Sequence, residues 1–71
     1  MLRLMAWRLL NGLNQVQAAR RLGMSHLTLG YLESGRMKPT ERDLRRLARH
    51  FGDRASALFE EVDPDAVAVS R

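Results

Sequence analysis

The stretch NQVQAARRLGMSHLTLGYLESG, residues 14–35, decides how this chain folds. It contains two segments with helical periodicity, Gln15–Leu22 and His26–Ser34, separated only by residues 23–25. So short a connection reverses the chain and favours a left-handed conformation at the end of the first helix, which the glycine at its start adopts without steric cost. Ala19 is small enough to let the two helix axes cross closely. The stretch therefore predicts a helix-turn-helix whose second helix has an exposed outer face.

Further helices are predicted on both sides of this stretch. Residues 2–11 form the first helix, and Thr40 caps another that Gly52 ends. The expected buried stripe of that helix is Leu44, Leu47, Ala48 and Phe51. A last helix is expected after Asp53, with a helical period carried by Ala55, Leu58, Phe59 and Val62. The fold class is thus all-α, a compact bundle of about five short helices.

A single domain accounts for the whole folded part of the 71-residue chain. We expect this domain to span residues 1–62. Residues 63–71 would form a C-terminal tail that is either disordered or an arm that adds to a partner subunit. No internal repeat or low-complexity tract points to a second unit.

Charge is distributed unevenly along the chain. The formal net charge is +4, with a sequence pI near 11.1. Residues 1–50 carry ten Lys/Arg against three Asp/Glu, a balance of +7, whereas residues 51–71 carry two against five, a balance of −3. A basic body with an acidic end is typical of a protein that binds a polyanion. An arginine-rich surface that is merely solvated would give the same composition, so charge alone does not separate the two interpretations.

Several classes of function find no support in the residue pattern. The absence of cysteine excludes disulfides and thiolate metal sites and fits a reducing cytoplasm. His26 and His50 lie far apart, and no nucleophile triad, glycine-rich phosphate loop or carboxylate pair is present. The opening MLRLMAWRLL is interrupted by two arginines and is too short to span a bilayer. We therefore expect no enzyme, no metal, no cofactor, no small-molecule ligand and no membrane segment.

The first helix carries a second apolar stripe where solvent would be expected. Leu2, Met5 and Leu9 recur at helical spacing on its outer side. On a monomer such a stripe would form an exposed apolar patch, which tends to mark a contact with another protein. The other interpretation is that the first turn frays and these residues are scattered over the surface. Both stay open at this point.

A wider set of residues resembles the Xre/Cro family of helix-turn-helix regulators, which includes lambdoid phage repressors, bacterial controller proteins and many antitoxins. The residues that carry the resemblance are Gly12-Leu13-Asn14-Gln15, Ala19, Leu22-Gly23-Met24-Ser25, Leu29, Leu32-Glu33-Ser34-Gly35, Pro39 and Leu47-Ala48. The match covers roughly residues 4–59. It implies a lambda repressor-like fold of five helices, in which the second and third helices read double-stranded DNA.

The resemblance also implies a role for individual positions. Those that would line the major groove and read bases are Ser25, His26, Leu27, Thr28 and Tyr31, with Gly30 lying against the groove. Those that would bind DNA phosphates are Asn14, Gln15, Ser34, Arg36 and Lys38. Arg8 and Glu33 match an ion pair that ties the first helix to the third, which is a structural role.

This sequence departs from the family pattern on the recognition helix. The usual Gln, Asn and Arg side chains are missing there, so two-pronged hydrogen bonding to guanine or adenine is not available from its centre. A thymine methyl against Leu27 and single hydrogen bonds from His26, Thr28 or Tyr31 remain. Gly52-Asp53-Arg54 also replaces the more usual Gly-Val-Ser before the last helix.

These observations lead to two hypotheses of different classes. The first is a sequence-specific transcriptional regulator, a repressor in the cytoplasm (at the nucleoid) that binds a (pseudo)palindromic operator as a homodimer. The second keeps the fold but makes it a protein-interaction module, such as an antitoxin that neutralises a toxin or a domain that docks on the transcription machinery. The apolar outer side of the first helix and the few hydrogen-bonding groups of the recognition helix motivate the second.

Overall fold

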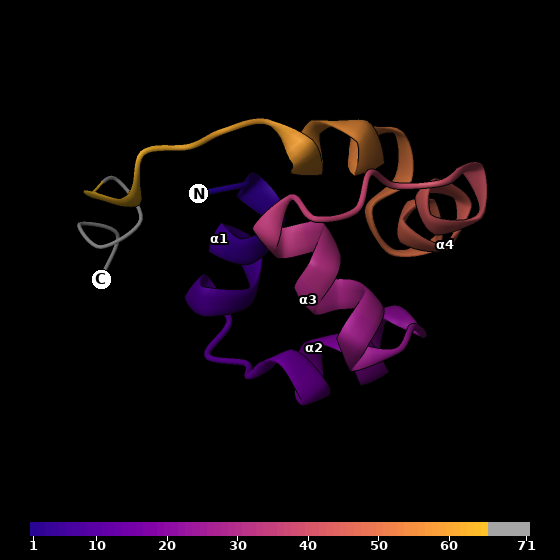
Figure 1. Ribbon diagram of the computed structural model, residues 1–71, viewed down its shortest axis with the longest axis horizontal. Helices are drawn as coiled ribbons and strands as arrows, with labels where there is room; N and C mark the ends of the chain where they lie inside the picture. The colour runs from indigo at the N-terminus through magenta and orange to yellow at the C-terminus, as the bar shows by residue number, and fades with distance from the viewer. Residues whose placement is uncertain (66–71) are drawn as a thin grey trace.

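The structure, a computed structural model, describes residues 1–65 of the chain. Within that range four α-helices are followed by one 3₁₀ helix, and no β-strand is formed. The elements are α1 (Arg3–Leu10), α2 (Gln15–Leu22), α3 (His26–Ser34), α4 (Glu41–Phe51) and the 3₁₀ helix η1 (Gly52–Phe59). In Figure 1, α1 lies to the left of α3, α2 below it and α4 to the right. The all-α class and the helix-turn-helix formed by α2 and α3 are confirmed.

Side chains and a glycine define the ends of α2 and the start of α3. The side-chain oxygen of Asn14 accepts the backbone N–H of Gln17 at 2.8 Å, and the Gln17 side chain accepts that of Asn14 at 2.9 Å. This reciprocal capping box satisfies two of the N–H groups that a helix start leaves open. Gly23 ends α2 in the left-handed region with φ of +71°. Two residues later, the hydroxyl oxygen of Ser25 accepts the N–H of Leu27 at 3.1 Å and so begins α3.

The N-terminus of α4 has the same kind of cap, but its buried stripe is narrower than predicted. Thr40 and Asp43 exchange backbone-to-side-chain hydrogen bonds at 3.1 and 3.0 Å. Leu47 is fully buried and Leu44 half-buried, whereas Ala48 is exposed. The prediction for Ala48 was wrong because it lies about 100° further round the helix than Leu47, beyond the edge of the buried face.

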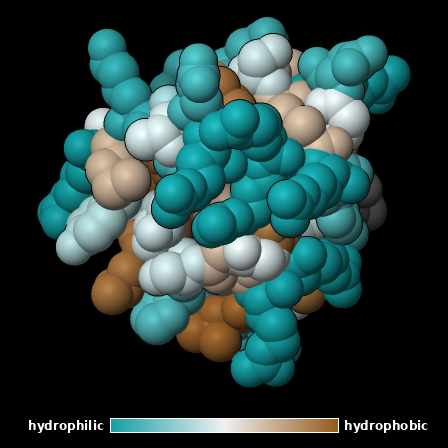
Figure 2. Space-filling model, turned by 90° about the vertical axis from the view of Figure 1, so that its right-hand side faces the viewer, coloured by the Kyte–Doolittle hydropathy of each residue, from teal (hydrophilic) through white to brown (hydrophobic). Residues whose placement is uncertain are grey.

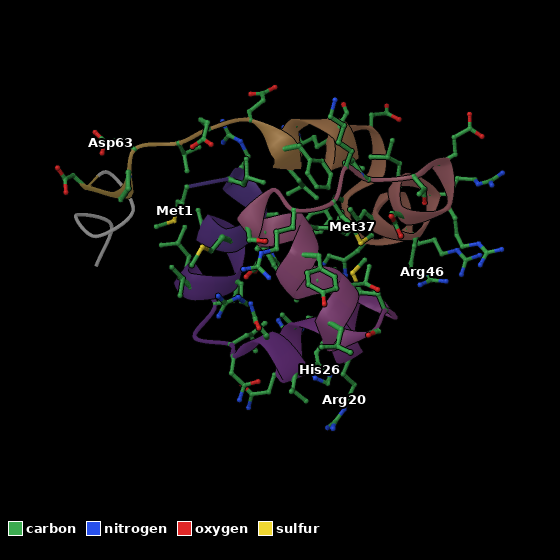
Figure 3. All side chains as sticks on the ribbon, in the orientation of Figure 1. Met1, Arg20, His26, Met37, Arg46 and Asp63 are labelled. Carbon is green, nitrogen blue, oxygen red and sulfur yellow. The ribbon has the colours of Figure 1, made fainter. Side chains whose placement is uncertain are left out.

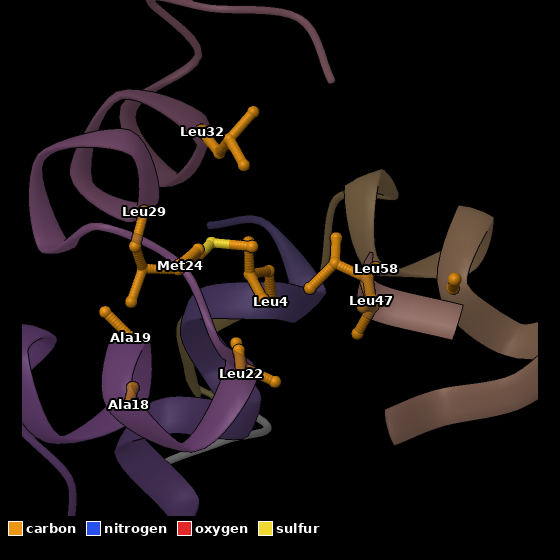
Figure 4. Packing of buried hydrophobic residues seen from close by; sticks show 10 residues of the cluster. Leu4, Ala18, Ala19, Leu22, Met24, Leu29, Leu32, Leu47 and Leu58 are labelled. Atoms are coloured by element: carbon orange, nitrogen blue, oxygen red, sulfur yellow. The ribbon is translucent and has the colours of Figure 1, made fainter. Parts of the chain in front are cut away.

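One apolar cluster joins all five elements. Its buried members are Leu4, Ala18, Ala19, Leu22, Met24, Leu29, Leu32, Leu47, Ala55 and Leu58. Figure 4 shows Leu4 of α1 between the side chains of the helix-turn-helix on one side and Leu47 and Leu58 on the other. Trp7 is half-buried against this cluster and meets the ring of Phe51 edge-on, with the ring centroids 5.1 Å apart. The core therefore fixes the angle between α2 and α3 and anchors both to the rest of the molecule.

The segment after α4 differs from the prediction. It forms a 3₁₀ helix that ends at Phe59, and no side chain caps its start, so neither an α-helix begun by Asp53 nor one continued to Val62 is present. The chain then turns back and pairs with its own beginning: the N–H of Arg3 donates to the carbonyl of Glu60 at 2.9 Å, and the N–H of Val62 donates to that of Met1 at 2.7 Å. This pairing, which sequence periodicity does not register, takes the place of the last helical turn.

The tail predicted for residues 63–71 falls mainly outside the described residues, because the structure describes only the first three of these positions. Among residues 1–65, no helix has both the length and the apolar character that crossing a membrane requires.

Candidate nucleic-acid interface

The outward face of α3 carries large side chains that do not pack against the protein. Leu27 is 60% exposed and Tyr31 is 42% exposed, and His26 at the start of the helix is exposed as well. Thr28 is half-buried. Ser25 is exposed, but its hydroxyl oxygen already caps the helix. Three of the five residues predicted to read bases thus project outward from α3. Of the other two, Thr28 is half-buried and Ser25 caps the helix.

The N-terminus of α2 supplies a different kind of group. The first N–H groups of a helix have no acceptor within it, and the helix dipole makes them attractive to an anion. Asn14 has its oxygen engaged in the cap, which leaves its amide NH₂ available at the same place. Gln15 is held over α3, because its Nε2 donates to a carboxylate oxygen of Glu33 at 3.1 Å. The adjacent Val16 is 46% exposed.

The turn that follows α3 is basic and well ordered by hydrogen bonds. The Ser34 hydroxyl donates to the carbonyl of Tyr31 at 3.2 Å and accepts the N–H of Arg36 at 3.4 Å. The N–H of Met37 donates to the same Tyr31 carbonyl at 3.3 Å. Ser34 therefore shapes the turn, and the exposed side chains of Arg36 and Lys38 supply its positive charge.

A shallow groove of about 310 Å³ brings the two predicted sets of residues together. It is lined by Gln15, His26, Leu27, Gly30, Tyr31, Ser34 and Arg36. His26, Leu27 and Tyr31 belong to the predicted base-reading set. Gln15, Ser34 and Arg36 belong to the predicted phosphate-binding set. His26 is labelled in Figure 3 at the lower end of α3, where the base-reading part begins. Asn14 and Lys38, also predicted phosphate ligands, lie outside the lining.

A buried ion pair underlies this groove. Arg8 of α1 donates from Nε to one Glu33 carboxylate oxygen at 2.7 Å and from Nη2 to the other at 3.1 Å. The two side chains are only 10% and 3% exposed. Arg8 also donates to the carbonyl of Leu13 at 3.1 Å, and Gln15 adds a third donor to the carboxylate. The network ties α1, the α1–α2 connection and the start of α2 to the last turn of α3, so it fixes the backbone on which the groove is built.

A family model described as helix-turn-helix matches residues 4–54, which is well over half of the chain. The chain belongs to the Xre/lambda repressor-like helix-turn-helix family. No curated protein and no solved structure gave a match. The family is one of DNA-binding regulators, and its matched range contains α2 to α4, all of α1 except its first residue, and the whole groove.

This helix-turn-helix protein also has exposed apolar side chains that the sequence pattern did not single out. Val16 lies beside the N-terminus of α2, and Leu10, at the end of α1, is 54% exposed. Leu9 is 43% exposed, whereas Leu2 and Met5 of the same predicted stripe are half-buried. The apolar surface of α1 is therefore concentrated at its C-terminal end. Helical spacing alone did not reveal this, because the pairing of residues 1–3 with residues 60–62 partly covers the start of α1.

Gly30 gives a test of how closely a ligand approaches the groove of this helix-turn-helix protein. A Cβ at this position would lie 3.5 Å from the Gln15 side chain, an ordinary contact, and the residue sits inside α3. We expect Gly30→Ala to stabilise the fold by about 0.5–1 kcal/mol through helix propensity and to raise the thermal midpoint by about 2–8 °C. If the backbone of α3 meets DNA directly, the same variant binds DNA more weakly despite its greater stability. Circular dichroism melting and a DNA titration measure the two effects separately, and equal binding by both proteins contradicts the close approach.

Proposed function

We propose that this protein is a transcriptional repressor that binds a (pseudo)palindromic operator as a homodimer. The observation that carries the proposal is the groove in which exposed side chains of α3 stand next to two groups suited to phosphates, the N-terminus of α2 and the basic turn after α3. In a dimer, two such recognition helices would enter successive major grooves about 34 Å apart, and the half-sites would be centred about 10 base pairs apart.

The exposed groups of α3 limit what base sequence the protein can read. Leu27 has no hydrogen-bonding group and fits the methyl group of thymine. The imidazole of His26 and the hydroxyl of Tyr31 each make single hydrogen bonds. We therefore expect an operator that is read at a few positions, with at least one A·T pair opposite Leu27, and an affinity to which phosphate contacts contribute strongly.

Selection of bound sequences from a random duplex pool, at two salt concentrations, tests the proposal. We expect an enriched inverted repeat with one-turn spacing that persists at the higher salt. His26→Ala is expected to relax the preference at one position in each half-site and to cost about 0.5–1.5 kcal/mol per half-site, the value of a single hydrogen bond. Arg36→Gln is expected to weaken binding to all sequences alike and to lower the slope of log affinity against log salt by about 0.9 per subunit. Enrichment without any sequence preference contradicts the proposal.

A second candidate function rests on the exposed leucines of α1. Leu9 and Leu10 stand side by side in the sequence at the C-terminal end of α1, and both are exposed. Burying a leucine fully is worth about 1.5–3 kcal/mol, so this pair could anchor a protein partner such as a toxin. The protein would then be an interaction module with the same fold.

Leu9→Glu separates the two candidates. Under the second candidate, the variant loses binding to its partner while its helical content and its DNA affinity stay unchanged. Under the first, the variant retains selective DNA binding, and it affects dimerisation only if this surface forms the dimer interface. A pull-down that is compared with sedimentation of the free protein distinguishes these outcomes.

A further inference from the structure

A second basic surface lies outside the groove. A cleft of about 270 Å³ opens between the C-terminal ends of α2 and α4. Its charged walls are Arg20 and Arg21 from α2 and Arg46 and Arg49 from α4, with His50 beside them. Figure 2 shows the side of the molecule at the right of Figure 1, where α4 lies, and hydrophilic residues cover most of its centre. These arginines come from two helices that are far apart in the sequence, and the packing of α2 against α4 brings them together.

The positive charge of this cleft is not neutralised by the part of the chain that the structure describes. The ion pairs among residues 1–65 involve Met1, Arg3 and Arg8, and none involves the four arginines of the cleft. The C-terminal ends of α2 and α4 contribute about half a negative charge each, which leaves a surplus of about three positive charges.

The cleft also lies next to the start of the recognition helix. Only residues 23–25 separate the end of α2 from the start of α3, and Gly23 itself lines the cleft. Arg20 and His26 are labelled at the same lower end of the molecule in Figure 3, with Arg46 extending from the right-hand side. A duplex that meets His26 and runs on past the end of α2 toward α4 would reach the cleft.

We propose that this arginine cleft is a second binding site for backbone phosphates, which holds the DNA beyond the base pairs that α3 reads. The inference rests on the proposed function. It extends the DNA that the protein contacts beyond the base pairs read by α3. Arginine is suited to the task because its planar fork of donors matches the geometry of a phosphate group. Several closely spaced cations also match a duplex, which carries one negative charge per about 1.7 Å of its axis.

A second copy of this chain could offer another polyanion to the cleft, namely the acidic residues that follow η1. However, the carboxylates of Glu60 and Glu61 already have cationic neighbours within their own chain: Glu60 lies 3.8 Å from Arg3, and Glu61 lies 3.1 Å from the amino group of Met1. Both glutamate side chains are largely exposed in these contacts, and ion pairs with an exposed partner are worth little. An exchange of such pairs between two copies gains little free energy, whereas DNA binding releases condensed counterions. The free energy of binding therefore favours DNA phosphates over the acidic residues of a second copy as the ligand of the cleft.

The experiment compares duplexes of two lengths. One duplex ends at the base pairs recovered by selection, and the other extends about ten base pairs further on each side. For the wild-type protein, we expect tighter binding to the longer duplex and a steeper dependence of affinity on salt. For Arg46→Gln/Arg49→Gln, the gain from the added length is expected to disappear, and the salt slope is expected to fall by about 1–2 per subunit. The preferred sequence stays the same.

Two further variants keep the result interpretable. Arg45→Gln/Arg54→Gln removes the same charge from exposed residues outside the cleft and is expected to leave the length effect intact. Arg46→Lys/Arg49→Lys keeps the charge and is expected to recover most of the salt slope. If the cleft variant matches the wild type in slope and length effect, the phosphate site is overturned, and an acidic protein becomes the alternative ligand. If the wild type shows no preferred sequence but the cleft variant still lowers the salt slope on a random duplex, the proposed function fails while the phosphate site stands.

Discussion

Replacing Glu33 by alanine is expected to destabilise the fold by about 3–5 kcal/mol. The carboxylate accepts two hydrogen bonds from Arg8 and one from Gln15, and its side chain is only 3% exposed. Its removal leaves the guanidinium group buried without a counter-charge, which is the costly case for a buried pair. A domain of this size typically has about 4–11 kcal/mol of stability in total, so the variant would lose a large share of it. Urea unfolding followed by the fluorescence of Trp7 measures the loss.

The chain contains a matched control for this experiment. Arg3 and Glu60 form an ion pair of 3.8 Å in which the side chains are 52% and 65% exposed. We expect Glu60→Ala to cost less than about 1 kcal/mol because solvent screens that pair. The double variant Arg8→Leu/Glu33→Leu removes both buried charges and is expected to be more stable than either single variant. A cost for Glu33→Ala as small as that for Glu60→Ala would contradict the assignment of a buried, coupled pair.

Leu47→Ala is expected to have the second-largest effect, a loss of about 2–5 kcal/mol. Leu47 has no exposed surface, and it is the fully buried residue that α4 contributes to the central cluster. Truncation removes buried apolar surface and leaves a cavity between α4 and the other helices. The slightly better helix propensity of alanine offsets only a few tenths of a kcal/mol. The free energy of unfolding in urea, with an unchanged m-value, checks the prediction.

Leu10→Ala provides the comparison for the same chemical change on the surface. Leu10 is 54% exposed at the end of α1, so we expect its truncation to change stability by no more than about 0.5 kcal/mol. If the two leucine variants were equally stable, α4 would not be closely packed on the core. Because neither residue lines the groove, folded protein of either variant should retain the DNA preference of the wild type.

The parts of this fold that depend on local chemistry could be predicted from the sequence. Asn14, Ser25 and Thr40 cap helices where the sequence places them, and Gly23 has the left-handed conformation that the short turn requires. Such signals work because each residue contacts backbone groups only a few positions away. The spacing of Ala19 and the buried leucines then determined which faces meet, and the family match followed from these features.

The parts that depend on distant segments could not be predicted in this way. The segment from Gly52 to Phe59 is apolar at nearly helical spacing, but it forms a 3₁₀ helix, and the residues that follow it, 60–62, pair with residues 1–3. The hydrogen bond from Gln15 to Glu33 and the arginine cleft likewise join residues that are far apart in the sequence. Periodicity and propensity describe one element at a time, so contacts between elements lie beyond their reach.

The pairing of residues 1–3 with residues 60–62 also has a consequence for the order of folding. Contacts inside the helix-turn-helix join residues close together in the chain and can form early, whereas this pairing closes a loop of almost the entire domain. None of the paired residues belongs to the central apolar cluster, so the pairing should open by itself in the native state, long before the core unfolds. We expect the amide protons of Arg3 and Val62 to exchange with solvent well before those of Leu29 and Leu32. This pairing would then be the last part of the domain to form and the first to open, while the groove on the outward face of α3 stays assembled.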